Sequence, residues 1–235
     1  MNILYSTKNT INDPTSIDSA IYDLMAGLMI VFVLISIGFM VQVQEETQKV
    51  QEINNQYQEQ SELINSYDIV KSDINDDLIN AFGEDLDLLN MEITPENTIR
   101  FNSPEVLFSN GQSEISDDFK FILDKFFPIY LDLIYSNYKD SIKEIRIEGH
   151  TSTEWSQNVS PNVAYFNNMR LSQDRTRSVL EYVMNLPSSE PYRDWLVANM
   201  IANGLSSSHP IINPLTGKED SARSRRVEFK IVTLM

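Results

Sequence analysis

Asp23 is the residue whose placement most clearly indicates chemistry, because it stands at the entry of an apolar run that reaches Glu45. An ionised carboxylate inside a bilayer costs several kcal/mol unless it is paired, hydrated or protonated, which makes it a candidate proton carrier. On a helix, Ala20 and Gly27 would share its face, and their small side chains would let a partner helix approach closely. From position alone, Asp23 is either this proton carrier or, like Asp18, a marker of the membrane interface.

Other reactive combinations are missing from the sequence, which contains no cysteine and has His150 and His209 as its histidines. Disulfides and thiolate metal sites are therefore excluded, and two histidines are too few for a zinc site without carboxylate help. Nothing resembles a Ser-His-Asp triad or a supported pair of catalytic carboxylates. Acidic residues outnumber basic ones by 34 to 18, and the net charge of -16 argues against a nucleic-acid partner. We predict no enzymatic activity, no metal and no nucleic acid.

The apolar run itself has the length of a membrane helix. Its roughly twenty uncharged residues fit a helix that crosses a hydrocarbon core of about 30 Å. A cleaved signal peptide is the alternative, but the preceding segment has one lysine and two aspartates, and no small-residue cleavage site follows the run. We therefore expect an N-terminal tail over 1–19 and a retained transmembrane helix over 20–43. Lys8 and Lys49 balance each other on the two sides, so charge leaves the orientation open.

Residues 44–94 begin as a polar stretch rich in Gln and Glu, with a thin apolar seam. The seam has spacings of seven, three, four and seven residues and consists of Val43, Val50, Ile53, Tyr57 and Ile64. This heptad pattern favours two parallel helices, and an unpaired helical stalk or a flexible linker is the alternative. We predict a helical stalk or linker that is dimeric, with Gly83 as a break.

From about residue 92 the pattern changes to short apolar strands separated by helices. The predicted strands are 98–101, 106–108, 142–148, 199–203 and 227–233, and the predicted helices are 116–138 and 171–184. Pro128 is expected to kink or divide the first of these helices. The order indicates an α/β (α+β) sandwich over 95–235, with helices on one face of a small mixed sheet.

Four short motifs in this region carry a family resemblance. They are VLFSNGQSEI at 106–115, IEGHTS at 147–152, NMRLSQDR at 168–175 and SRRVEFKI at 224–231. In this order they resemble the successive signatures of OmpA-like peptidoglycan-binding domains. A membrane helix with an acid near its start, joined to such a domain, resembles the MotB-type stator subunits of ion-driven motors. The resemblance implies an OmpA-like sandwich preceded by a single transmembrane helix and a helical stalk.

The resemblance also implies a binding site for the peptide stem of peptidoglycan. Arg175 would bind the diaminopimelate carboxylate with both arms of its guanidinium, near the free N–H groups of a helix N-terminus. Asn168 and Leu171 occupy the other positions of its motif. The alternative is that Arg175 pairs with Asp174 or Glu181 on the helix surface.

The second part of this site departs from the usual GHTD motif of the family. Here Thr151 is followed by Ser152, where an aspartate ordinarily receives the diaminopimelate ammonium. Glu154 is a candidate substitute; otherwise the site binds more weakly or prefers another feature of the stem. Arg225 and Arg226 would alternate across the last strand, with Arg225 near the ligand and the other on the surface.

Two kinds of motor share this layout. Flagellar stator subunits usually have a plug segment after the membrane helix and a GHTD-type domain, whereas this chain continues from Met40 directly into the stalk. With its GHTS and NMxLSxxR motifs it is more similar to the B subunits of Zorya anti-phage defence systems. The resemblance implies a MotA-like (ZorA-like) multi-helix membrane subunit as partner, in a ring around a dimer of this chain, and peptidoglycan as the second partner.

The same resemblance implies a location in the bacterial inner membrane, with one membrane pass, a cytoplasmic N-terminus and a periplasmic C-terminal domain. It implies protons as the transported ion, with sodium as the alternative, and no other cofactor. The predicted function is that of the cell-wall-anchored subunit of a proton-driven rotary motor that serves anti-phage defence. A flagellar-type stator subunit and a non-motor envelope tether that binds peptidoglycan are the alternatives.

Overall fold

The computed structural model describes residues 14–102, 104–155 and 159–234 and divides the chain into two compact units, Met1–Glu62 and Leu63–Met235. Helix α1 (Pro14–Phe82) contributes to both units. The tail predicted over 1–19 lies outside the described residues up to residue 13, and from Pro14 onward it is already helical. Proline suits a first helical position, because its missing N–H would have no partner there anyway.

The described residues of the first unit form the first part of α1. Its apolar side chains, such as Ile21, Phe32 and Val43, are exposed along the predicted membrane span. In the described part of the chain, α1 is the one helix long and apolar enough to cross a membrane, by length and composition. A helix that is apolar all round and not covered by protein is typical of a membrane span. The bounds 20–43 remain a prediction.

The last turns of α1 belong to the second unit. Ile74, Leu78 and Phe82 are buried in its core, and their spacing of four residues places them on one face of the helix. The helix ends at Phe82, as the predicted break at Gly83 requires. The N–H of Gly83 donates to the carbonyl oxygen of Ile79 at 2.8 Å, and a Cβ on this glycine would lie 2.6 Å from the same oxygen.

The domain boundary predicted at residue 95 is wrong, because the folded domain begins earlier. Strand β1 (Met91–Thr94) pairs antiparallel with strand β2 (Thr98–Phe101). Asn75 of α1 holds this hairpin, since its Nδ2 donates to the carbonyl oxygen of Thr94 at 2.8 Å and to Oδ1 of Asn97 at 2.9 Å. Strand β1 continues the mixed acidic and apolar pattern of the segment DLDLLN at 85–90, so local pattern could not separate it from the stalk.

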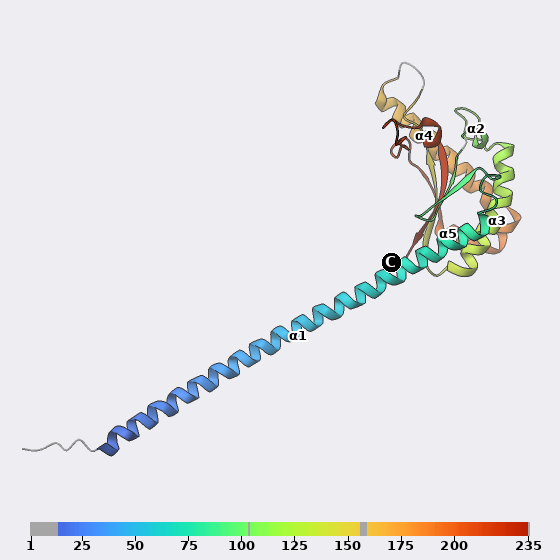
Figure 1. The fold of residues 1–235 in the computed structure, drawn as a ribbon. Coiled ribbons are helices and arrows are strands. Elements are labelled where there is room, and N and C mark those ends of the chain that lie inside the picture. The colour runs from blue at the N-terminus through green and yellow to red at the C-terminus, as the bar shows by residue number, and fades with distance from the viewer. Residues whose placement is uncertain (1–13, 103, 156–158, 235) are drawn as a thin grey trace, which may run out of the picture. The chain divides into compact units, whose positions relative to one another are not determined.

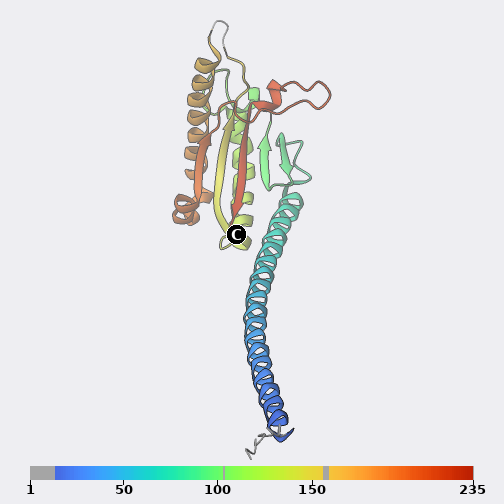
Figure 2. The ribbon, with the colours of Figure 1, turned by 90° about the vertical axis from the view of Figure 1, so that its left-hand side faces the viewer.

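The second unit is built on a five-stranded sheet with the order β1-β2-β5-β3-β4. The remaining strands are β3 (Ile142–His150), β4 (Met200–Gly204) and β5 (Arg226–Thr233). Strands β3 and β4 are parallel and are connected through α4 (Pro161–Met184), η1 (Pro187–Tyr192) and α5 (Arg193–Asn199), whereas the other neighbours are antiparallel. Figure 2 looks onto this mixed sheet and shows the strand order.

Helix α3 (Asp117–Tyr138) packs on the sheet through an aromatic core. Ser116 caps its first turn, accepting a backbone hydrogen bond of 3.0 Å. The ring of Phe126 lies 5.1 Å from that of Phe101 and 5.3 Å from that of Phe229, in edge-to-face contacts. Pro128 lies inside α3 and does not divide it.

Helix α4 lies on the same face of the sheet, directly against β3 and β4 (Figure 1). Gly149 and Gly204 are neighbours in these strands. A Cβ on Gly149 would lie 2.6 Å from Thr176, and one on Gly204 would lie 2.3 Å from the backbone of Gln173. The two glycines therefore let the helix approach the strand ends, which sets the positions of the side chains that α4 places there.

Two of the predicted elements of the domain are wrong, and the others match within a few residues. The segment predicted as a strand at 106–108 is helix α2 (Pro104–Leu107), followed by a single bridge between Phe108 and Ile115. The helix predicted from residue 171 begins at Pro161, where Ser160 accepts a capping hydrogen bond and proline occupies the first turn. A short helix α6 (Ser221–Ser224) precedes β5.

Candidate functional site

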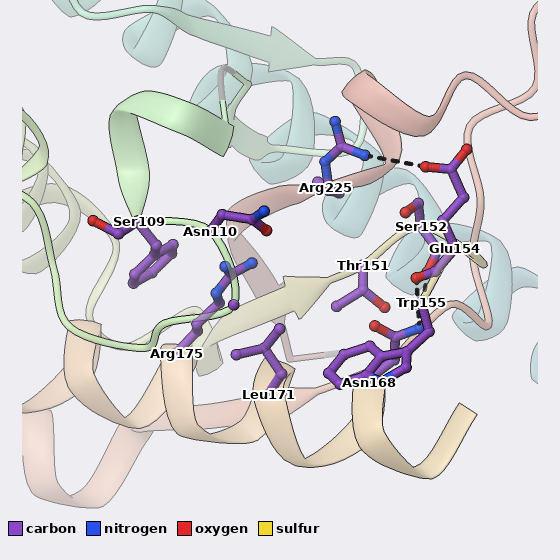
Figure 3. A pocket seen from close by; sticks show the side chains of 12 residues that line it. Ser109, Asn110, Thr151, Ser152, Glu154, Trp155, Asn168, Leu171, Arg175 and Arg225 are labelled. Carbon is purple, nitrogen blue, oxygen red and sulfur yellow. Dashed lines mark hydrogen bonds and ion pairs between the residues drawn. The ribbon is translucent and has the colours of Figure 1, made fainter. Parts of the chain in front are cut away.

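A cavity of about 660 Å³ opens where the end of β3, the first half of α4 and the segment before β5 meet (Figure 3). All six residues predicted to bind peptidoglycan line it: Thr151, Ser152, Asn168, Leu171, Arg175 and Arg225. The other lining residues are Phe108, Ser109, Asn110, Gly111, Glu154 and Trp155. The four motifs found in the sequence therefore converge on one pocket.

Of the two arginines that line the pocket, Arg175 and Arg225, Arg175 is held by more contacts. It lies on α4, is 8% exposed, and donates from Nε to the carbonyl oxygen of Gln112 at 2.9 Å. Its guanidinium lies 4.7 Å from the centre of the Phe108 ring, a cation–π contact. Burial, and then the charge of Arg225, lowers the pKa of Arg175 to about 10, so the side chain stays charged at neutral pH. Neither terminal nitrogen of Arg175 has a hydrogen-bond partner among the described residues, so both can bind an acceptor in the pocket.

The alternative that Arg175 pairs with an acid on the helix surface is wrong. Asp174 pairs instead with Arg177, at 3.3 Å, and Arg177 is 73% exposed. In the described part of the chain, Arg175 makes no ion pair with Asp174, with Glu181 or with any other acid. The arginine of the motif thus faces the pocket, and its neighbour two positions later faces water.

The segment 152–154, which forms one wall of the pocket, is held from two sides. Asn168 donates from Nδ2 to the carbonyl oxygens of Ser152 and Glu154, at 3.1 and 3.3 Å. From the other side the backbone N–H of Thr153 donates to the carboxylate of Glu219 at 3.1 and 3.2 Å, and the Thr153 hydroxyl donates to the same group. Asn168, predicted as a ligand contact, therefore also shapes the pocket wall.

Arg225 directly follows α6 and Arg226 is the first residue of β5, so the two do not alternate within the strand, and only half of the prediction is right. Arg225 lines the pocket, and its Nη1 lies 3.6 Å from Oε2 of Glu154. Arg226 is not on the surface: it is 6% exposed and donates from Nε to Oε1 of Glu228 at 2.7 Å. A charged side chain is buried here because its carboxylate partner is buried with it.

A buried charged cluster lies beside the pocket, at the end of β3. One carboxylate oxygen each of Glu148 and Glu228 and one ring nitrogen of His150, all potential metal ligands, lie within 4.8 Å of one another. His150 Nε2 is 3.3 Å from Glu228 Oε2. Burial lowers the pKa of His150. Burial alone would raise the pKa of Glu228, but its close approach to His150 and the charge and hydrogen bond of Arg226 hold that pKa well below its usual range. The other oxygen of Glu228 accepts from Arg100 and Arg226, both at 2.7 Å.

These arginines supply the countercharge of the cluster, so its carboxylates do not depend on a cation for neutrality. The cluster combines His150 with two carboxylates, which is the set of ligands that a zinc site with few histidines would require. The register of β3 against β5 creates the arrangement by placing Glu148 opposite Glu228. The prediction that the protein holds no metal remains a prediction.

Asp23 belongs to the first unit, where it lies exposed on α1. Ala20 and Gly27 are exposed one helical turn before and after it, and a Cβ on Gly27 would meet nothing within 4 Å. The space beside Asp23 is thus open to the approach of another helix. Its role as a proton carrier remains a prediction.

Comparison with known proteins places the chain in a family. No family model matches it. Over 213 residues it is 46% identical to the Zorya protein ZorB of Escherichia coli, and the match covers 90% of this chain and 85% of that protein. This chain belongs to the ZorB family. A solved structure of a MotB-like protein from Desulfovibrio vulgaris is similar with a TM-score of 0.50 at 23% identity, over 74% of this chain and 97% of that one.

These comparisons confirm two predictions, the ZorB-type resemblance and the mixed α/β fold of MotB-like domains. The expectation of a non-enzymatic protein agrees with membership of the ZorB family. Phe108 and Gln112, which hold the Arg175 side chain, were not predicted as site residues. Both lie inside the first motif, so the sequence carried a signal for them. Glu219 stands in no motif, so only the folded structure connects it to the pocket.

Proposed function

We propose that this chain is the cell-wall-anchored subunit of a proton-driven rotary motor in the bacterial inner membrane, which serves anti-phage defence. The observation that carries the anchoring role is the pocket, where Arg175 is buried, charged and without an acidic partner among the described residues. Membership of the ZorB family supports the motor and the defence role.

The anchoring chemistry follows from what the pocket offers. Peptide stems of peptidoglycan carry free carboxylates, and a guanidinium binds a carboxylate through two parallel hydrogen bonds. Phe108 and Gln112 hold Arg175 in place, so its terminal nitrogens are already oriented toward the cavity. Arg225 adds a second positive charge, while Leu171 gives an apolar wall. A pocket that is preorganised in this way binds with less loss of conformational freedom.

The motor part of the proposal assigns one pass through the inner membrane to α1, with a cytoplasmic N-terminus and a periplasmic second unit. Two copies place two Asp23 carboxylates inside a ring of MotA-like (ZorA-like) subunits. Protons, or sodium as the alternative ion, then neutralise each carboxylate in turn and change its contacts with the ring. One charge that crosses 100 mV releases about 2.3 kcal/mol, enough to bias a step between two packed states of similar energy. The pocket holds the dimer to the wall while the ring turns.

Sedimentation with purified peptidoglycan sacculi tests the anchoring role. The full chain in detergent should sediment with sacculi, and Arg175→Ala should reduce the bound fraction by about tenfold or more, because a charged hydrogen-bonded contact is lost. Arg177→Ala is the matched control, since this arginine lies on the same helix and is 73% exposed. Both variants should keep the wild-type melting profile within a few degrees. Equal retention of Arg175→Ala and wild type would remove the anchor assignment.

A further inference from the structure

The charged groups of the pocket form a pattern that suits one kind of ligand. Among the described residues that line it, Arg175, Arg225 and Glu154 carry formal charges. Arg175 has no acidic partner in the described part of the chain, whereas Nη1 of Arg225 lies 3.6 Å from Oε2 of Glu154. The two guanidinium groups are close enough for Arg225 to act on the pKa of Arg175. The pocket therefore offers an unpaired cation beside an ion pair.

The pair of Glu154 and Arg225 is one that a ligand can separate. The Glu154 side chain is 68% exposed and the Arg225 side chain 37% exposed. Ion pairs this open to water contribute little to stability, because solvent and salt screen them. Their separation of 3.6 Å is also longer than the roughly 2.7–2.9 Å of a strong charged hydrogen bond. Once separated, the two groups would accept opposite charges from a ligand.

Glu154 is presented from a fixed backbone, which distinguishes it from a mobile surface acid. Asn168 holds its carbonyl oxygen, and Glu219 holds the amide of the preceding residue. The neighbouring side chains, Thr151 and Ser152, are buried and uncharged, and Thr151 Oγ1 has no hydrogen-bond partner among the described residues. In the view of Figure 3, these two hydroxyl residues lie between Arg175 and Glu154.

We propose that Glu154 is the ammonium acceptor of this pocket and that the ligand separates Glu154 from Arg225 as it binds. The matching ligand carries a free carboxylate and a free ammonium on the same carbon, as the unlinked end of a diaminopimelate side chain does. Its carboxylate binds the two arginines and its ammonium binds Glu154. The uncharged Ser152 supplies no countercharge, so selection of the ammonium depends on Glu154. This inference rests on the proposed function, because the peptide stem is what presents such a group.

Isothermal titration of the full chain in detergent micelles tests this assignment with three soluble muropeptides. The first has a free diaminopimelate end, the second has its ammonium acetylated, and the third has its carboxylate amidated. Wild type should bind the first at least about tenfold more tightly than either blocked form. Glu154→Gln should bind the free and acetylated forms equally, yet still prefer both to the amidated form. Glu96→Gln, which removes an exposed acid from the turn between β1 and β2, should keep the wild-type preferences.

The outcomes separate this inference from the proposed function. If Glu154→Gln still discriminates against the acetylated form as wild type does, Glu154 is not the acceptor, while the anchoring role stands. If wild type sediments with sacculi but does not distinguish the three muropeptides, the zwitterionic ligand is wrong and anchoring again stands. If wild type binds neither sacculi nor muropeptides, the proposed function fails and this inference fails with it.

Discussion

The membrane-length part of α1 and the pocket of the second unit use their residues in opposite ways. In the helix, Asp23 stands among exposed apolar side chains, so its role depends on its own chemistry and on what a partner places beside it. In the pocket, several separate segments converge, and Arg175 and the segment 152–154 are each held by other residues. We infer that the helix is sensitive to the identity of one residue, and that the pocket is sensitive to geometry, including residues that never touch its ligand.

The sharpest test of the helix is Asp23→Asn. Asparagine has nearly the same shape but cannot take up and release a proton, so protection against phage should fall to the level of cells that lack the chain. Co-purification with the proposed MotA-like subunit should be unchanged. Asp18→Asn, which removes an acid five residues earlier on α1, should retain protection. Full protection by Asp23→Asn would contradict the proton-carrier role and favour the alternative that Asp23 marks the membrane interface.

The corresponding test of the pocket changes a residue outside it. A Cβ on Gly204 would lie 2.3 Å from the backbone nitrogen of Gln173, so Gly204→Ala must displace α4 from the sheet. We expect the free energy of unfolding to fall by about 1–3 kcal/mol and the affinity for sacculi to fall with it. Gly38→Ala, where a Cβ would meet nothing within 4 Å, lies in the first unit and is the control; it should leave the unfolding of the second unit and the affinity for sacculi unchanged. Unchanged stability of Gly204→Ala would show that the close approach of α4 is not needed.

The cluster beside the pocket predicts a pH dependence. Burial lowers the pKa of His150 below its ordinary value of about 6.5, so the unfolded chain takes up this proton before the folded chain does. The free energy of unfolding should therefore fall as the pH drops from about 7 to 5, and His150→Gln should flatten that slope. Urea titrations at fixed pH values measure it, with His209→Gln as the control. A wild type that becomes more stable over this range would show that the nearby carboxylates keep His150 protonated.

The smallest expected effect concerns the support of the pocket wall. Glu219→Ala removes the acceptor for the backbone N–H and hydroxyl of Thr153, so the segment that carries Glu154 loses one of its two anchors. Affinity for the free muropeptide should fall by roughly three- to tenfold, with the melting profile preserved. Glu190→Ala, an exposed acid on η1, should bind as wild type does. Identical affinities of the two variants would mean that Asn168 alone fixes the wall.

Local patterns predicted most elements of the fold, and they failed where structure depends on partners distant in sequence. Alternation in KEIRIEG identified β3 because one face of that strand is apolar. A period of two did not identify β1, whose residues continue the mixed acidic and apolar pattern of 85–90. The helical period did not identify the first turns of α4, whose side chains are largely exposed. The buried residues at the end of α1 have ordinary helical spacing, and only the sheet that covers them makes them core.

The candidate site divides in a similar way. Arg175 and its five companion residues could be named because they stand in motifs that resemble a known domain, and the structure brings them to one cavity. The burial of Arg226 could not be foreseen, because it depends on Glu228 and on the register of β5 against β3. Glu219 could not be foreseen either, because its contact with Thr153 joins segments 66 positions apart.

The buried end of α1 has a mechanical consequence. Rotation of this helix about its own axis by a single residue, about 100°, would carry Ile74, Leu78 and Phe82 out of the core. It would also break the hydrogen bonds of Asn75 to the turn between β1 and β2. These contacts therefore prevent the last turns of α1 from rotating relative to the sheet. Torque on these last turns of α1 is transmitted to strand β1 at the edge of the sheet. If the domain is bound to the cell wall, it therefore prevents this part of the helix from turning.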